Sequence, residues 1–333
     1  MNILLFGGTG RLSKDFVNLL VDSGVNVFCL TRGSEYRELF IHEKATMLYA
    51  DVRDVIQCKR VLDGHFFDVV IDFISYTSQN IENKLNILEY NFTQYIFISS
   101  ATVYTPTEAV HDEKTSSISN MDWDYSANKV RCESYLSALK GEFEKYNSYY
   151  TIVRPYVTYG NTRMPYPLEP LDGIYEYSLV KRLLQGQEMV VINQDNKVTI
   201  THTRDFAQGL MGLLKNKSAV FEDFHITGDG TCKWEDVIDI CGNILKTDVK
   251  KVFFDLQEII TYLPEYKDLL LCDKANSWLF DNSKIKKAVP GFECKVDMEK
   301  GLAEMLDFYK KYGKGQRRDL NYENKIQELC RLR

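Results

Sequence analysis

The chain opens on a short apolar segment that ends at a cluster of glycines, and this feature restricts the fold more than any other. Residues 2–6 fit a buried parallel strand, and Gly7-Gly8-Thr9-Gly10 follows directly. Residues 11–21 then carry apolar side chains at helical spacing. A strand, a glycine turn and a helix in this order are typical of dinucleotide-binding folds, in which the helix N-terminus attracts a pyrophosphate. Ser13 stands at the third glycine position, where a small residue still allows close packing of the helix.

Strands and helices alternate over the first 160 residues. Short apolar segments that fit buried strands recur at residues 25–30, 46–49, 68–74, 94–99 and 150–154. Segments with helical spacing lie between them, at residues 51–62, 79–90 and 125–146. This alternation predicts an α/β fold, a doubly wound parallel sheet of the Rossmann type with helices on both faces.

The composition changes after residue 160, where prolines become frequent and the regular alternation ends. We therefore expect a dinucleotide-binding Rossmann domain over residues 1–160 and a smaller mixed α/β substrate lobe over residues 161–333. Elements around residues 188–225 are expected to return to the first domain, and the charged tail 313–333 is expected to form a loose helix. The lobe would close over the carboxyl edge of the sheet, where ligands bind in open α/β folds.

Tyr125 and Lys129 lie four residues apart, so they share one face of a predicted helix. Ser100 follows the fifth predicted strand. An ammonium group beside a phenol favours the phenolate, so we expect Lys129 to lower the pKa of Tyr125. Such a phenol can take the proton of a substrate hydroxyl while a hydride leaves the same carbon, and Ser100 would hold that oxygen in place. The alternative is an ordinary solvated helix face.

Composition excludes several classes of protein. The 333 residues carry a net charge of −6, which argues against a general nucleic-acid binder. No apolar stretch is long enough to cross a bilayer, and no signal peptide is expected at the N-terminus. The eight cysteines are scattered without a Cys-x-x-Cys pair, so we expect reduced thiols, no metal site and a cytoplasmic location.

The end of the second predicted strand bears on the choice between NAD and NADP. An acidic residue at this position would hold a ribose 2′-hydroxyl, whereas an arginine fits a 2′-phosphate. The chain has Thr31 and Arg32 there, so Arg32 favours NADP. A solvated arginine, or one that stacks on adenine with either cofactor, is the alternative. Asp51 and Val52, after the third strand, are placed to meet the adenine.

Five segments in the same order resemble the extended short-chain dehydrogenase/reductase superfamily, and within it the NAD-dependent nucleotide-sugar epimerase/dehydratase family. The matching segments are residues 7–10, 98–104, 125–129, 153–160 and 201–207. The resemblance implies that Ser100, Tyr125 and Lys129 are catalytic. It implies cofactor contacts from Gly7, Gly8, Thr9, Gly10, Arg11, Leu12, Thr31, Arg32, Asp51, Val52, Phe73, Ser75, Ser99, Tyr125, Lys129, Pro155 and Val157.

The expected substrate contacts are fewer and come from the two sides of the site. Thr102 and Tyr104 follow the catalytic serine, and Asn161 stands near the position where many relatives place an asparagine against the substrate. Arg163 and Arg182 are candidates for a substrate diphosphate, because a planar guanidinium group suits phosphate.

The resemblance implies a nucleotide-sugar substrate and a reaction at one of its hydroxyls. Residues Ala101-Thr102 follow Ser100 in place of the acidic pair of the 4,6-dehydratases, which argues against dehydration. We expect epimerisation, at C4, through a transient keto intermediate. The alternatives are an NADPH-dependent reductase of a 4-keto sugar nucleotide and a non-catalytic relative that binds nucleotide or RNA. The family also implies a homodimer through the helices at residues 79–90 and 125–146, with Val130, Tyr135, Leu136 and Leu139 as candidate contacts.

Overall fold

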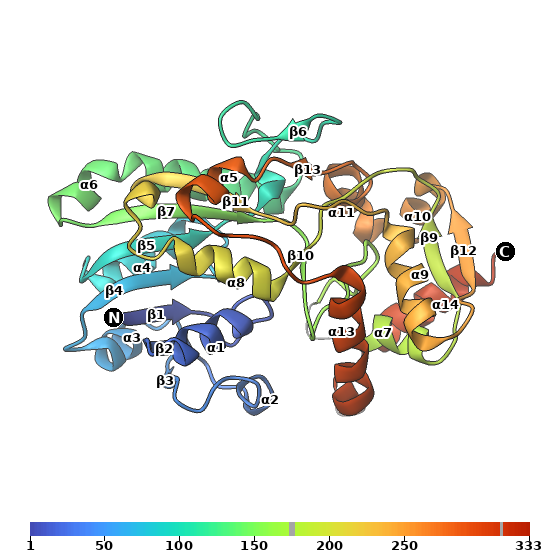
Figure 1. Ribbon diagram of the computed structural model, residues 1–333, viewed down its shortest axis with the longest axis horizontal. Helices are drawn as coiled ribbons and strands as arrows, with labels where there is room; N and C mark the ends of the chain where they lie inside the picture. Colours follow the sequence, from blue (N-terminus) through green and yellow to red (C-terminus); the bar gives the residue numbers. More distant parts are fainter. Residues whose placement is uncertain (173–176, 314–315) are drawn as a thin grey trace.

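Figure 1 shows the computed structural model of the protein, which describes residues 1–172, 177–313 and 316–333. A seven-stranded sheet in the order β11-β7-β5-β4-β1-β2-β3 fills one half of the molecule, and all neighbouring strands in it are parallel. This topology confirms the predicted doubly wound α/β fold. The strands are β1 (Asn2–Phe6), β2 (Asn26–Thr31), β3 (Thr46–Tyr49), β4 (Phe67–Asp72), β5 (Phe92–Ile98), β7 (Tyr149–Pro155) and β11 (Glu222–Ile226).

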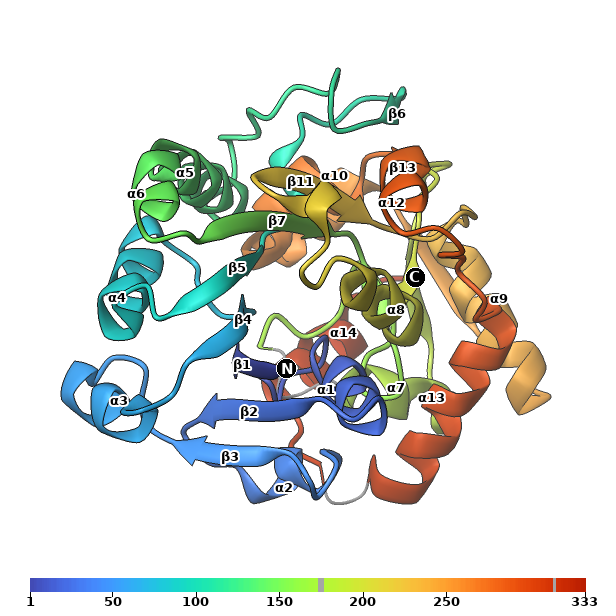
Figure 2. The ribbon, with the colours of Figure 1, turned by 60° about the vertical axis from the view of Figure 1, so that its left-hand side comes forward.

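Helices cover both faces of this sheet (Figure 2). One face packs against α1 and α8 through buried side chains such as Phe16 and Phe206. The other face packs against α3, α4, α5 and α6 through side chains such as Leu85 and Leu136. The helices of this half are α1 (Lys14–Asp22), α2 (Glu35–Glu38), α3 (Val55–Leu62), α4 (Ser78–Leu88), α5 (Asp124–Ala138), α6 (Lys140–Lys145) and α8 (Thr203–Gly212).

Two elements differ from the expected ones. The helix predicted over residues 125–146 is broken at Leu139, which ends α5 and precedes α6. The edge strand β11 was expected only as one of the elements around residues 188–225 that return to the first domain. It was not singled out as a strand, because its sequence Glu-Asp-Phe-His-Ile does not have the continuous apolar pattern of a buried parallel strand. Its polar residue Asp223 instead forms an ion pair with Arg154 of the neighbouring strand β7.

The second half of the molecule is a mixed α/β lobe with its own apolar core, which includes Trp234, Tyr266 and Trp278. Three two-stranded parallel pairs, β8–β10, β9–β12 and β6–β13, lie outside the large sheet. Their strands are β6 (Val110–His111), β8 (Thr158–Tyr159), β9 (Met189–Ile192), β10 (Thr201–His202), β12 (Lys251–Phe254) and β13 (Leu279–Phe280). The helical elements outside the large sheet are η1 (Ala101–Val103), α7 (Tyr177–Leu184), η2 (Lys217–Ala219), α9 (Trp234–Leu245), α10 (Leu256–Tyr262), η3 (Pro264–Tyr266), α11 (Lys267–Leu269), η4 (Leu270–Lys274), α12 (Ser283–Ala288), α13 (Met298–Tyr312) and α14 (Leu320–Cys330).

Helix α14, in the C-terminal part of the charged tail, packs within this lobe. Helix α14 buries Tyr322, Ile326 and Leu329 and packs against α7 and β9. The Glu323 carboxylate accepts hydrogen bonds from Ser178 and Lys181 of α7. The tail therefore docks through an apolar stripe and an ionic contact, and is more than the loose helix that its charge suggested.

The outer face of α4 and α5, where the family resemblance implies a dimer contact, exposes polar residues, whereas the predicted contact residues Val130 and Tyr135 are half-buried. Asn86, Arg131 and Ser134 are exposed there. Two of the predicted contact residues face inward, because Leu136 is fully buried and Leu139 packs against the core beneath α5. Within the described ranges, every helix is too short or too polar to span a bilayer.

Candidate functional site

A cavity of about 420 Å³ lies where the carboxyl edge of the large sheet meets the lobe. Ligands bind at this edge in open α/β folds. Its walls combine the glycine turn, the ends of β4, β5 and β7, the first turns of α5 and α8, and the α11–η4 segment. The lining residues are Gly7, Gly10, Arg11, Leu12, Ser13, Phe73, Ile74, Ile98, Ser99, Ser100, Thr102, Trp123, Tyr125, Lys129, Pro155, Tyr156, Val157, Thr158, Gly160, Thr162, Arg163, Glu169, Thr203, Leu269, Asp273 and Lys274.

The glycine turn presents bare backbone to this cavity. Gly7 has a φ of +84°, and a Cβ atom on it would lie 2.4 Å from the Ile74 side chain. Ser13 closes the turn, because its hydroxyl donates to the Gly7 carbonyl at 2.7 Å and accepts from the Gly10 amide at 3.0 Å. Helix α1 begins at the next residue. A turn from which side chains are sterically excluded, at a helix N-terminus, fits the pyrophosphate of a dinucleotide.

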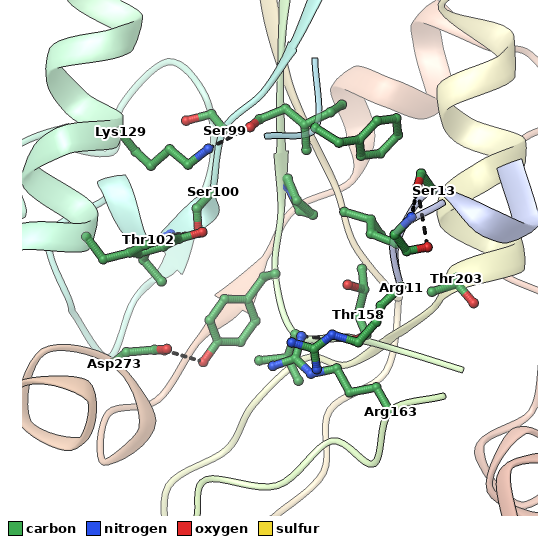
Figure 3. Close-up of a pocket in the computed structure, with 18 of the residues that line it drawn as sticks. Arg11, Ser13, Ser99, Ser100, Thr102, Lys129, Thr158, Arg163, Thr203 and Asp273 are labelled. Carbon is green, nitrogen blue, oxygen red and sulfur yellow. Dashed lines mark hydrogen bonds between the residues drawn. The ribbon is translucent and has the colours of Figure 1, made fainter. Parts of the chain in front are cut away.

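Ser100 and Thr102 lie together on the wall opposite the glycine turn (Figure 3), and Tyr125 lines the same cavity. Ser100 follows β5 and caps η1, and its Oγ lies 2.9 Å from Thr102 Oγ1. Tyr125 lies in the first turn of α5, between the rings of Tyr76 and Trp123 at centroid distances of 5.9 and 4.9 Å. The two hydroxyl side chains and the phenol that the sequence singled out therefore line one cavity.

The pKa of Tyr125 differs in direction from the expectation. Burial raises the pKa of this phenol above its usual value. A hydrogen bond with Ser100 and the positive charges of Arg163 and Lys274 act against this rise, and the charge of Asp273 adds to it. The expectation that Tyr125 has a lowered pKa is wrong for this state of the protein, because desolvation outweighs the opposing contacts.

Lys129 is buried and points at backbone oxygens. Its Nζ donates to the Ser75 and Ile98 carbonyls, both at 2.9 Å. Burial lowers the pKa of Lys129, and the charge of Asp72 acts in the opposite direction. The ammonium is thus held at the carboxyl ends of β4 and β5, beside the cavity wall.

The segment after β4 is organised by a buried ion pair that the sequence interpretation missed. The Asp72 carboxylate accepts from the Ser75 amide at 2.9 Å and from the Tyr95 hydroxyl at 2.6 Å, and it lies 3.4 Å from Lys84 Nζ. Lys84 also donates to the Ser75 hydroxyl at 2.6 Å. The segment that carries Phe73 is therefore fixed against the cavity. The sequence did hold one indication of this ion pair, since Asp72 is an acidic residue at the end of a buried apolar strand.

The backbone is strained directly after β7, where the chain borders the cavity. Val157 has a φ of +29°, which is unusual for a β-branched residue. Gly160, close behind it, has no room for a side chain, because a Cβ atom would lie 2.4 Å from Thr203 Oγ1. Strained backbone of this kind concentrates at ligand-binding sites.

Arg11, Arg163 and Glu169 form an ionic cluster that joins the glycine turn to the lobe. Arg163 Nε donates to Glu169 Oε2 at 3.0 Å, and Arg11 Nη1 lies 3.9 Å from the same oxygen. Burial opposes ionisation of Glu169, but the two arginines outweigh it and hold its pKa below the usual value. Figure 3 shows Arg11 and Arg163 next to each other.

Three tyrosines from distant parts of the lobe hold the segment that carries this cluster. Their hydroxyls donate to its backbone carbonyls: Tyr309 to Thr162 at 2.7 Å, Tyr322 to Leu168 at 2.7 Å and Tyr266 to Glu169 at 2.9 Å. We call residues 160–170 the carbonyl-held loop. Its position therefore depends on α13, α14 and η3.

Several predicted contacts lie away from the cavity. Tyr104 is fully buried, and its hydroxyl accepts from Arg154 Nη1 at 2.8 Å in the core. Arg182 is also buried, and its Nη2 donates to the Glu188 carbonyl at 2.8 Å. We therefore correct both expectations, since these side chains serve packing within the fold. Asn161 lies in the carbonyl-held loop but is not among the lining residues.

The predicted adenine end is separate from the cavity. Arg32 is exposed after β2, and Thr31, Asp51 and Val52 are partly buried. Hydrogen bonds from Arg53 lower the pKa of Asp51, with a smaller contribution from the charge of Arg32. Gly8, Thr9 and Ser75 also fall outside the lining set, whereas Ser99 and Pro155 belong to it. Lining residues that the sequence interpretation missed include Trp123, Glu169, Leu269, Asp273 and Lys274.

Comparison with known proteins places the chain among relatives. A family model described as the NAD dependent epimerase/dehydratase family matches residues 3–227. The chain is 26% identical over 326 residues to the chloroplast stem-loop binding protein of 41 kDa b of Arabidopsis thaliana, covering 92% of this chain and 79% of that protein. It is 24% identical over 295 residues to the UDP-glucose 4-epimerase of Yersinia enterocolitica, covering 77% of this chain and 85% of that protein.

Solved structures show the same architecture. The UDP-glucuronic acid 4-epimerase from Bacillus cereus, in complex with NAD, superimposes with a TM-score of 0.73 at 16% identity and covers 93% of this chain and 99% of that chain. At this identity the likeness speaks for the fold.

Proposed function

The chain belongs to the NAD dependent epimerase/dehydratase family, and we propose that it inverts the C4 hydroxyl of a nucleotide-activated sugar through a transient 4-keto intermediate. The observation that carries this proposal is the meeting of Ser100 and Tyr125 with the glycine turn in one cavity, with Lys129 one helical turn beyond the tyrosine. The hydroxyl set can move a proton, and the bare turn can hold a dinucleotide.

In the proposed reaction, bound NAD or NADP would supply the hydride acceptor and donor. Tyr125, as phenolate, takes the proton of the sugar hydroxyl and later returns it to the oxygen of the keto sugar. Ser100 holds the reacting oxygen by a hydrogen bond. Lys129, fixed by the Ser75 and Ile98 carbonyls, orients the nicotinamide ribose.

Cofactor and substrate contacts follow from the same cavity. Gly7, Gly10 and Arg11 are proposed to hold the pyrophosphate, and Arg32 favours NADP at the adenosine ribose. Arg163 is proposed to bind a substrate phosphate, because its guanidinium faces the cavity beside Arg11. We further propose that the protein works in the cytoplasm as a homodimer.

The test is turnover of a panel of UDP-, dTDP-, GDP- and CDP-sugars by the wild type and by Tyr125→Phe. We expect the substitution to lower kcat by about 10²–10⁴-fold, because it removes the acid–base hydroxyl. The matched control is Tyr76→Phe, which removes a hydroxyl from the ring that lies 5.9 Å from that of Tyr125. If Tyr125→Phe keeps full turnover, or if NAD and NADP both fail to bind the wild type, the proposal is wrong.

A second candidate reaction uses the same residues for net reduction of a 4-keto sugar nucleotide with NADPH. Arg32, at the position that discriminates a ribose 2′-phosphate, is the observation that favours it. The two reactions differ in stoichiometry. A reductase consumes one NADPH for each product formed, whereas an epimerase leaves the cofactor unchanged over many turnovers.

A binding function without turnover has one specific observation behind it, the name of the Arabidopsis relative as a stem-loop binding protein. The net charge of −6 argues against it here, since phosphate contacts dominate nucleic-acid affinity. Titration with an RNA stem-loop at two salt concentrations tests this function. Salt-sensitive binding that Tyr125→Phe leaves unchanged would support it.

A further inference from the structure

Two consecutive charged residues on the lobe side of the cavity have no part in the reaction proposed above. Asp273 and Lys274 are the last two residues of the π-helical segment η4, and they are 2% and 6% exposed, respectively. Both line the same cavity as Ser100 and Tyr125. Short π-helical segments recur at functional sites in proteins.

The backbone around this pair is fixed from several sides. The indole Nε1 atoms of Trp278 and Trp234 donate to the Asp273 and Lys274 carbonyls, both at 2.9 Å. Asn120 donates to the Thr102 carbonyl at 2.8 Å and to the Cys272 carbonyl at 3.3 Å. One amide group therefore couples the pair to the segment of the catalytic hydroxyls.

The pair has hydrogen-bonding capacity that the protein does not use. Asp273 Oδ1 accepts from the Tyr156 hydroxyl at 2.9 Å, and Oδ2 lies 2.8 Å from Lys274 Nζ. Within the described ranges, these are the hydrogen-bonding side-chain partners of the two groups, and Lys274 Nζ also lies 5.2 Å and 5.6 Å from the ring centroids of Tyr156 and Trp234. A carboxylate has about four acceptor sites and an ammonium group has three donors, so each retains room for a ligand atom.

Stability alone does not account for such a pair. Replacing a buried ion pair by apolar residues of similar volume is often neutral or stabilising, because the desolvation of both charges opposes folding. Here the pair faces a cavity, and its charges reach the catalytic phenol: Lys274 lowers the pKa of Tyr125 and Asp273 raises it. A ligand group at the pair therefore lies close to the reacting carbon.

We propose that Asp273 and Lys274 bind two neighbouring hydroxyls of a neutral sugar, next to the carbon that reacts at Tyr125. This assignment rests on the proposed function. A hydroxyl both donates and accepts, so a vicinal diol can donate to the carboxylate and accept from the ammonium group. A uronate carboxylate would face the negative charge of Asp273, and an amino sugar would face Lys274. The pair thus selects a neutral hexose or pentose.

The experiment compares dissociation constants by calorimetry for three probes with the same base: the nucleoside diphosphate, its glucose conjugate and its glucuronate conjugate. The base is the one of the UDP, dTDP, GDP and CDP series that the wild type binds best. The variants are Asp273→Asn and Lys274→Gln. The matched control is Glu265→Gln. Glu265 lies in the nearby segment η3, outside the cavity, and its carboxylate pairs with Lys325 of α14.

We expect the wild type to bind the glucose conjugate at least about tenfold more tightly than the glucuronate conjugate, since hydrogen bonds to charged groups carry this much discrimination. Asp273→Asn should abolish or reverse this preference, because the ammonium group then faces the uronate without its counter-ion. Lys274→Gln should weaken both conjugates and widen the preference. Affinity for the diphosphate alone should stay within about threefold in all variants, and Glu265→Gln should match the wild type.

Three results would overturn the assignment. They are a wild type that prefers the uronate, a preference that neither variant changes, and a control that changes it as much as Asp273→Asn. If Asp273→Asn does not fold, the opposite shift expected for Lys274→Gln still decides the question. Failure of the proposed function looks different, because then neither the dinucleotide nor any member of the panel binds.

Discussion

At Tyr125, a single phenol is subject to opposing influences. Burial raises its pKa, whereas Ser100, Arg163 and Lys274 lower it. The base form of the phenol is the one that accepts a proton, so the rate of sugar oxidation should rise with pH towards the pKa of Tyr125.

Removing the hydrogen bond with Ser100 should move this profile. Ser100→Ala deletes a contact that lowers the pKa of Tyr125, so the rising limb is expected at higher pH, together with a fall in kcat. Single-turnover reduction of the bound nicotinamide across a pH series measures the limb. Ser126→Ala is the matched control, because the Ser126 hydroxyl is buried and has no hydrogen-bond partner among the described residues. An unshifted limb in Ser100→Ala would show that this bond does not tune the phenol.

Residue by residue, the sequence predicted what a local motif specifies and missed what the tertiary fold assembles. Ser100 and Tyr125 stand in short recognisable segments, and both line the cavity. Asp273 and Lys274 come from a π-helical segment about 150 residues later with no motif around it. The side chain of Tyr104 was misassigned because only the fold shows that Arg154 lies under it.

Among the elements, the carbonyl-held loop depends on helices far from it in sequence. Tyr322 is in the C-terminal helix α14, and its hydroxyl reaches the Leu168 carbonyl beside Glu169. The tail thus contributes to the position of the ionic cluster in the cavity.

Tyr322→Phe should expose this dependence. The substitution leaves a buried carbonyl without its partner, so the free energy of unfolding should fall by about 1–3 kcal/mol. Affinity for a nucleoside diphosphate should fall as well, because the loop that carries Arg163 is less fixed. Denaturant titration and calorimetry measure the two effects. Tyr262→Phe, which removes a surface hydrogen bond between α10 and Glu328 of α14, should change neither by more than about 0.5 kcal/mol. Equal effects of the two substitutions would contradict the role of the loop contact.

The elements of the first half were predictable because each carries its own periodicity. Strand β11 and the pair β6–β13 were not, since their short sequences gain stability only from contacts with distant segments. The break between α5 and α6 falls at Leu139, two residues before Gly141, a glycine that the sequence interpretation passed over when it continued the helix to residue 146.

Across the whole molecule, stability should carry an unusual pH dependence from one carboxyl group. Glu113 follows β6, and its side chain is 3% exposed beside His225, with Asp223 and Lys284 also acting on it. Burial raises the pKa of Glu113 from 4.5 to about 7. The folded state therefore holds this proton to a higher pH than the unfolded chain does.

The sign follows from proton linkage. Below pH 4.5 the Glu113 carboxyl group is protonated in both the folded and the unfolded state, so its contribution to the free energy of unfolding is fully present. As the pH rises from 4.5 to about 7, the free energy of unfolding falls, by at most about 3 kcal/mol, and it is level above that range. Glu113→Gln should remove this fall. Denaturant titration from pH 4 to 8 measures it, with Glu108→Gln, at an exposed site in the same segment, as control.

The buried histidines contribute to the pH dependence of stability with the opposite sign, so the sign of the change distinguishes Glu113 from them. Burial lowers the pKa of His111 and of His225 to about 4, so their contribution rises with pH where that of Glu113 falls. If the wild type and Glu113→Gln show the same pH profile, the carboxyl group titrates normally.

The way in which the carbonyl-held loop is fixed affects how the binding site can evolve. Three tyrosine hydroxyls, of Tyr309, Tyr322 and Tyr266, donate to backbone carbonyls of the loop. Every amino acid has a backbone carbonyl, so these contacts do not depend on which side chains stand at Thr162, Leu168 and Glu169. Natural variation or directed evolution can therefore exchange the charges that the loop presents while its frame persists. The segment is where libraries aimed at new substrates should be placed.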